Sequence, residues 1–119
     1  MAAAARLICL SADLVEGGPG VRFSVGQHDG DEPAFVVRYR GRALAYLNRC
    51  GHVPVELDWQ PGQFFDDSKI YLICATHGAL YSPADGRCLG GRCQGRGLTP
   101  LAVAERDGAI YFTPSEKNS

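Results

Sequence analysis

The sequence predicts an all-β protein, either a small sandwich or an open barrel with at least six strands. Fifteen glycines and seven prolines divide the 119 residues into short segments, which is typical of turns between strands. Several of these segments are rich in apolar, aromatic and β-branched residues, as half-buried strands are. No stretch sustains a helical period over three turns, so long helices are not expected.

The N-terminal half supplies four predicted strands. The segments "RLICLS" (6–11) and "GVRFSV" (20–25) have strand composition and are separated by the turn-rich "EGGPG". The segment 33–49 carries apolar residues on both sides of Arg40-Gly41. This pattern predicts a β-hairpin with its turn at the Arg-Gly pair.

The C-terminal half supplies one further predicted strand and a second hairpin. The segment "KIYLICA" (69–75) predicts a strand that places Cys74 at its end. A second hairpin is expected over 101–114, with its turn at Asp107-Gly108. The polar tail 115–119 is expected to be disordered.

Length and charge limit the classes of function. A chain of 119 residues is expected to form one domain, 1–119. Its net charge of −1 argues against a nucleic-acid-binding protein. The N-terminal segment resembles no signal peptide, and no apolar stretch approaches the roughly 18 residues of a membrane helix. A cytoplasmic protein that is not membrane-bound is therefore expected.

Cysteine and histidine are concentrated in two short stretches, each after a predicted strand. The chain has five cysteines and three histidines, and two of each form Cys50-x-His52 and Cys74-x-x-His77. Two thiolates and two imidazoles suit either a tetrahedral structural Zn²⁺ or a [2Fe–2S] cluster. Zinc sites usually draw like ligands from one loop. One Cys and one His in each loop fit a binuclear site better, because each loop then supplies one ligand to each iron.

The motif resembles the Rieske pattern Cys-x-His…Cys-x-x-His-Gly. The downstream segments "YSPADGRCLGG" (81–91) and "GRGLTPLAVAERDGAIYF" are similar to the later strands of Rieske ferredoxins and of oxygenase Rieske domains. The resemblance implies a Rieske-like fold of three stacked antiparallel sheets, with two cluster-binding loops at the tip. It also implies one [2Fe–2S] cluster whose ligands are Cys50, His52, Cys74 and His77, with the cysteines on one iron and the histidines on the other.

Two features separate the chain from respiratory Rieske subunits. Those proteins carry a disulfide between the two ligand loops, and the matching positions here are Val55 and Thr76. In high-potential relatives a serine and a tyrosine follow the second histidine ligand, and the matching residues here are Ala79 and Tyr81. A potential in the lower part of the Rieske range is therefore expected.

The resulting functional prediction is a soluble Rieske ferredoxin, monomeric and not itself an enzyme. It would carry one electron from a flavin-dependent reductase to an oxygenase or similar acceptor. Once the motif histidines are used only His28 remains, so no mononuclear iron site is expected. Two alternatives stay open: a small accessory subunit of a larger reductase, as in nitrite reductase, and a structural zinc-binding interaction module.

The other notable residues have less specific interpretations. Cys9 is expected to be a small buried hydrophobe, and His28 a solvated loop residue. A disulfide between Cys88 and Cys93 is geometrically conceivable but not expected in a reducing cytosol. The Rieske resemblance places Cys93 in a third loop over the cluster, so a packing role is expected for it. In the spacer 58–68 the aromatic residues suit local packing better than partner docking, and Asp66-Asp67 suits a solvated turn.

Arginines at 49, 92 and 96 either form a positive collar that steers an acidic partner or merely solvate the loops.

Overall fold

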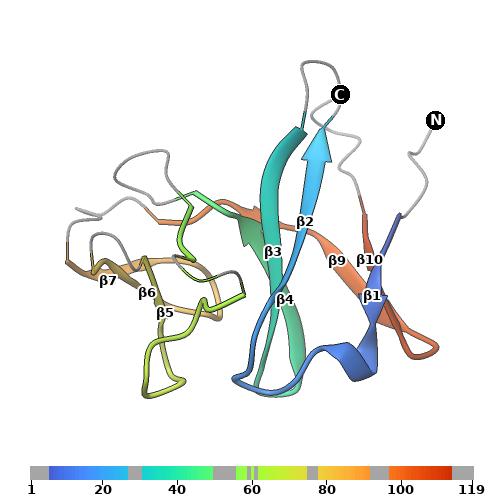
Figure 1. The fold of residues 1–119 in the computed structure, drawn as a ribbon, viewed down its shortest axis with the longest axis horizontal. Helices are drawn as coiled ribbons and strands as arrows, with labels where there is room; N and C mark the ends of the chain where they lie inside the picture. The colour runs from blue at the N-terminus through green and yellow to red at the C-terminus, as the bar shows by residue number, and fades with distance from the viewer. Residues whose placement is uncertain are drawn as a thin grey trace.

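The strands form three antiparallel sheets, as the Rieske resemblance implied. The computed structural model describes residues 6–26, 31–49, 56–58, 60, 62–74, 78–91 and 97–113. A four-stranded sheet of order β2-β3-β4-β8 lies between two three-stranded sheets, β1-β10-β9 and β5-β6-β7 (Figure 1). Among the described residues, no helix is long and apolar enough to cross a membrane.

The central sheet is built on the first predicted hairpin. Its strands are β2 (Val21–Gly26), β3 (Asp31–Tyr39), β4 (Arg42–Leu47) and β8 (Pro100–Leu101). The turn between β3 and β4 falls at Arg40 and Gly41, both with positive φ, at 52° and 78°. Two consecutive residues of this kind match the right-handed twist of the strands that they join. The predicted hairpin and its turn are therefore confirmed.

The second predicted hairpin forms most of an outer sheet. Its strands are β9 (Val103–Arg106) and β10 (Ala109–Phe112), joined through Asp107 and Gly108 with φ of 53° and 79°. Strand β1 (Arg6–Leu10) pairs with β10, far along the chain. It ends one residue before the predicted limit, because Ser11–Asp13 form a short 3₁₀ turn, η1.

The third sheet is made of much shorter strands. They are β5 (Leu72–Ile73), β6 (Leu80–Tyr81) and β7 (Cys88–Gly90). The predicted strand 69–75 is thus reduced to two residues. A turn occupies the preceding positions: Lys69 N donates to Asp66 O at 3.0 Å, and Lys69 has a positive φ of 66°.

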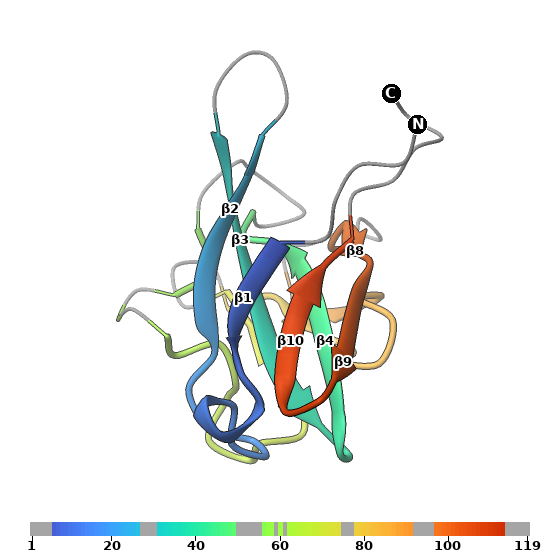
Figure 2. The same ribbon diagram turned by 90° about the vertical axis from the view of Figure 1, so that its right-hand side faces the viewer.

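The core has two parts because β3 is covered on both faces. Phe35 and Val37 are fully buried on the side of the β5-β6-β7 sheet, whereas Val36 is fully buried against Ile110 of the outer sheet. Neighbouring strand residues point to opposite faces, so one continuous apolar run serves both layers. Figure 2 shows the β1-β10-β9 sheet lying across the central strands.

Candidate metal centre

The second predicted ligand loop begins and ends on a β-hairpin. Strand β5 stops at Ile73, and Cys74 follows it with no exposed surface. The Cys74 N–H donates to Ala79 O at 2.9 Å, and the Gly78 N–H donates to Cys74 O at 2.7 Å. These bonds join the two flanks of the segment that contains His77, which itself lies outside the described residues.

The flank of this loop is closely packed. Ala79 and Tyr81 are fully buried in the same cluster as Cys74. Gly91, after β7, approaches so closely that a Cβ there would lie 2.9 Å from both Ala79 Cα and Gly78 O. Only glycine permits this contact, and its positive φ of 85° has the same requirement. The end of β7 is thereby held directly against the second ligand loop.

The first predicted ligand loop leaves the central sheet after β4. Asn48 follows that strand, and its side-chain Oδ1 accepts a hydrogen bond from Leu57 N at 2.8 Å. The two described flanks of the loop are therefore joined. Leu57 and Cys74 belong to one buried cluster, so a flank of each loop is anchored in the same part of the core. Cys50 and His52 lie outside the described residues.

The polar pair below this loop was missed by the sequence analysis. Asn48 and Asp58 are buried, at 1% and 6% exposure, and hydrogen-bond to one another at 2.9 Å. No local pattern marks either residue: Asn48 is followed by Arg49, and Asp58 lies between Leu57 and Trp59.

The charges beside the first loop are paired. Arg49 forms an ion pair with Glu32, and Arg22 forms one with Glu56 at 2.8 Å. One of the three arginines of the hypothetical positive collar is therefore neutralised by a neighbour. The other two, at 92 and 96, lie outside the described residues.

Two other cysteines are described, and one differs from expectation. Cys9 is half-buried against the outer core, in agreement with its expected role as a small hydrophobe. Burial raises the pKa of its thiol. Cys88 packs against the larger core cluster but is disulfide-bonded, with its partner outside the described residues. The expectation that it would stay reduced was wrong. That expectation was inferred from a reducing cytosol and not from the position of Cys88 in β7. Cys93 and His28 are not described.

The spacer between the loops is used for packing. Phe64 is fully buried and stacks on Phe35 with ring centroids 3.9 Å apart, and Phe65 stacks on Tyr39 at 6.3 Å. The packing interpretation is confirmed for these two phenylalanines, while Trp59 lies outside the described residues. Asp66 caps a turn by accepting the Ser68 hydroxyl at 2.7 Å.

The donor chemistry of the motif fits a [2Fe–2S] cluster. Of the four candidates, Cys74 is described, and it carries a buried thiol at the end of a strand. A buried thiolate is costly without compensation, and a bound metal provides it. Two thiolates with two imidazoles are the ligand set of a Rieske cluster.

The comparisons with known proteins agree with this chemistry. The chain matches the model of the Rieske [2Fe-2S] domain over residues 5–109. It therefore belongs to the Rieske [2Fe-2S] domain family, whose members bind a [2Fe–2S] cluster. No curated protein matches the chain significantly.

Solved structures support the same fold. The ferredoxin of carbazole 1,9a-dioxygenase from Nocardioides aromaticivorans IC177 is 18% identical, with a TM-score of 0.72 over 95% of this chain and 100% of that one. The Sphingomonas yanoikuyae B1 ferredoxin is 19% identical, with a TM-score of 0.72 over 94% and 100%. Apo dicamba monooxygenase is 22% identical, with a TM-score of 0.71 over 95% of this chain and 34% of that one. The predicted Rieske-like fold is confirmed.

Proposed function

We propose that the protein is a Rieske ferredoxin, a one-electron carrier that binds one [2Fe–2S] cluster. Cys50 and Cys74 would hold one iron, and His52 and His77 the other. The observation that carries the proposal is that a flank of each loop, Leu57 and Cys74, is buried in the same core cluster. Loops anchored in this way can supply ligands to a single binuclear site.

The cluster supplies a one-electron couple at a potential raised by its neutral imidazole ligands. The protein's own residues exclude water and fix the ligands. Cys74, Ala79 and Tyr81 are fully buried, so the cysteine side of the site is shielded from solvent. The hydrogen bond from Gly78 N to Cys74 O fixes the backbone at that ligand.

The proposed partners are a flavin-dependent reductase as donor and an oxygenase as acceptor. Two comparison structures are described as ferredoxins, and a third is a complex of reduced oxygenase and oxidised ferredoxin in carbazole 1,9a-dioxygenase. By analogy, this chain would transfer electrons without catalysing a reaction. The proposal extends to a monomer in the cytoplasm, which size-exclusion chromatography and fractionation of the native host would test.

Analysis of the metal content tests the proposal. Anaerobically purified protein should be red-brown, contain about two irons and two acid-labile sulfides per chain, and give a rhombic Rieske EPR signal after reduction. Cys50→Ser, His52→Ala, Cys74→Ser and His77→Ala should each lose that signal. Cys9→Ser, at a thiol packed in the outer core, should keep it. A colourless protein with stoichiometric zinc would contradict the ferredoxin proposal and favour a structural zinc-binding module.

The redox potential tests the kind of partner. A hydroxyl group that hydrogen-bonds to a cluster sulfur favours the reduced state, and Ala79 lacks the hydroxyl found in high-potential relatives. A hydrogen bond to a charged group contributes about 1.5–3 kcal/mol, of which only the difference between oxidation states changes the potential. The redox potential measured by voltammetry should therefore lie nearer −150 mV than +300 mV, the approximate limits of the Rieske range. Ala79→Ser should raise the potential by tens of millivolts. A wild-type redox potential above about +200 mV would contradict the role of a carrier that is reduced by a flavin reductase.

A further inference from the structure

Asn48 and Asp58 form a buried polar pair at the base of the first ligand loop. The Asp58 side chain has no exposed surface, and Asn48 is 1% exposed. Placing a carboxylate and an amide in an apolar core costs free energy unless their hydrogen bonds are satisfied. The surrounding structure must therefore provide partners for both side chains.

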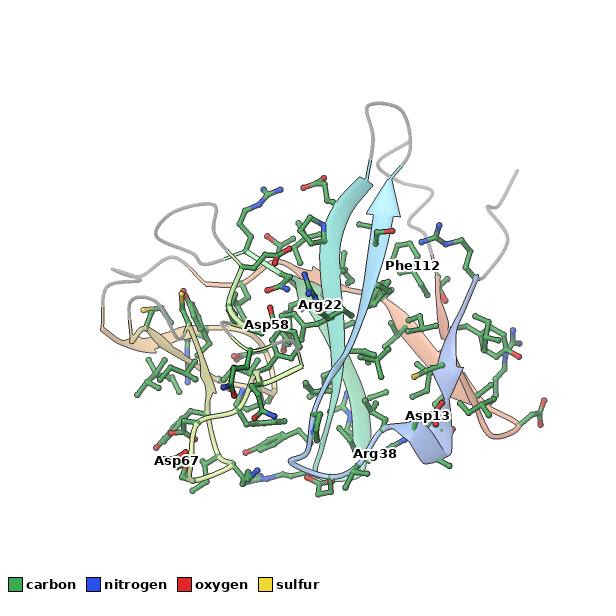
Figure 3. The ribbon with its side chains drawn as sticks, viewed as in Figure 1. Asp13, Arg22, Arg38, Asp58, Asp67 and Phe112 are labelled. Carbon is green, nitrogen blue, oxygen red and sulfur yellow. The ribbon has the colours of Figure 1, made fainter. Side chains whose placement is uncertain are left out.

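The partners come from both sides of the loop. Asn48 Nδ2 donates to Asp58 Oδ1 at 2.9 Å, and Asn48 Oδ1 accepts from Leu57 N at 2.8 Å. Asp58 Oδ2 accepts from Gly62 N at 2.9 Å and lies 3.5 Å from Arg22 Nε. Figure 3 shows Arg22 of β2 and Asp58 next to each other. The pair thus has three hydrogen bonds and one neighbouring cation.

The pair links the loop to the central sheet. Asn48 N donates to Pro33 O of β3 at 2.8 Å, and Gly62 O accepts from Gly20 N, just before β2, at 2.8 Å. The loop base is therefore tied to β3 and to the residue that precedes β2 in the central sheet. Asn48 lies two positions before Cys50, so any displacement of Asn48 reaches the predicted ligand through a very short length of chain.

We propose that Asn48 and Asp58 are positioning residues for the cluster: by closing the base of the 49–56 loop, they hold Cys50 and His52 in register with Cys74. This inference rests on the proposed function. A purely structural pair would stabilise the fold without affecting the cluster. The two roles differ in what a substitution changes.

Isosteric substitutions separate these roles. Asp58→Asn replaces an oxygen by an amide nitrogen, which must then face one of two donors, Gly62 N–H or Asn48 Nδ2. One hydrogen bond is lost with almost no change in volume. Asn48→Asp places two carboxylates in contact, and one again lacks a donor.

The exchanged double variant, Asn48→Asp with Asp58→Asn, allows all three hydrogen bonds again. The amide at 58 can donate to the carboxylate at 48 and accept from Gly62 N, and the carboxylate can accept from Leu57 N. Geometry is restored, although the negative charge is moved away from Arg22. Rescue by this variant would show that the hydrogen-bond pattern is what matters.

The matched control is Glu105→Gln, in an ion pair with Arg38 on the other side of the molecule. Arg38 contacts both carboxylate oxygens of Glu105, at 3.0 and 2.7 Å, in a network with no residue of the ligand loops. This variant should lower the thermal stability and leave the cluster unchanged.

The experiment uses the cluster-loaded full chain. Loss of visible absorption under an iron chelator, EPR g values and the unfolding temperature are measured on the same samples. We expect each single variant to lose its cluster roughly tenfold faster, or more, with shifted g values, since residues that orient metal ligands have effects of this size. In the exchanged double variant, the rate of cluster loss and the g values should both return towards those of the wild type.

Several results would overturn the inference. Single variants that unfold earlier but keep wild-type bleaching rates and g values would make the pair structural only. The inference also fails if Glu105→Gln accelerates bleaching equally, or if the exchanged variant does not recover. These results all require a wild-type protein with an iron–sulfur signal. Absence of that signal would instead refute the proposed function itself.

Discussion

The central sheet and the β5-β6-β7 sheet differ in how they are stabilised. In the central sheet β2, β3 and β4 contain six to nine residues each, and their ladders pair over most of that length. In the β5-β6-β7 sheet the strands contain two or three residues. Strands so short bring few hydrogen bonds, so this sheet depends on contacts made from outside it.

Those contacts come mainly from the central sheet. Phe64, next to β5, stacks on Phe35 of β3, and Tyr46 of β4 donates its hydroxyl hydrogen bond to Pro83 O at 2.6 Å. Gly86 lies against the Tyr46 ring. The part of the protein that carries the second ligand loop is thus held by side chains more than by its own ladder. The following predictions test this difference, from the largest expected effect to the smallest.

Phe64→Ala should have the largest effect. Phe64 is fully buried between the two sheets, and its carbonyl accepts a hydrogen bond from Ile73 N at 2.9 Å. Replacing a buried phenylalanine by alanine typically costs about 3–5 kcal/mol. Urea unfolding monitored by far-UV circular dichroism should show a loss of this size. Ile70→Ala, at a side chain that is half exposed, should change stability by less than about 0.5 kcal/mol.

Gly86→Ala should be the next most severe change. A Cβ at this position would lie 2.8 Å from Tyr46 Cε1, and φ is +77°. The left-handed backbone costs about 1–2 kcal/mol for alanine, and overpacking adds roughly 1–3 kcal/mol. Gly108→Ala is the matched control, because its φ of +79° is similar and nothing lies within 4 Å of the added Cβ. Equal losses from the two variants would show that contact with Tyr46 is not restrictive.

Tyr46→Phe should have a smaller effect, concentrated in one region. Burial raises the pKa of Tyr46 to about 12, so its hydroxyl stays protonated and donates at all moderate pH values. Its removal leaves Pro83 O buried without this donor, at a cost of about 1–3 kcal/mol. Hydrogen exchange should accelerate at Ser82 and Gly86, whose amides hydrogen-bond within the adjacent turn. Acceleration equally strong in β2 and β3 would contradict the view that Tyr46 supports chiefly the small sheet.

The Arg38–Glu105 pair should give the smallest effect, and it depends on pH. The hydrogen bonds from Arg38 lower the pKa of Glu105 from 4.5 to about 2. Because the folded-state pKa is the lower one, the stabilisation is complete above about pH 4.5. It is lost as the pH falls towards 2. For a partly exposed pair we expect about 1 kcal/mol at neutral pH.

Glu105→Gln tests this pH dependence. The variant should be less stable than the wild type at pH 7, and the difference should shrink as the pH falls below 4.5. Thermal unfolding across this range gives the measurement. A stability difference that does not change with pH would show that Glu105 acts through packing and not through its charge.

The sequence by itself determined the elements whose signals are local. Both long hairpins were predicted with their turns, because Arg40-Gly41 and Asp107-Gly108 can adopt the positive φ that tight turns require. The spacing of the Cys/His motifs is also local, and it led to the Rieske family. These features depend on residues close together in the chain, so a single sequence is enough to read them.

The tertiary structure alone decided how the distant segments meet. The pairing of β1 with β10, at the opposite end of the chain, could not be read from 6–11. Likewise, nothing near Asn48 in the sequence indicates that its amide closes a loop by bonding to Asp58. Such contacts form when packing removes water from polar groups that must then find partners, and which groups are buried together depends on the whole fold.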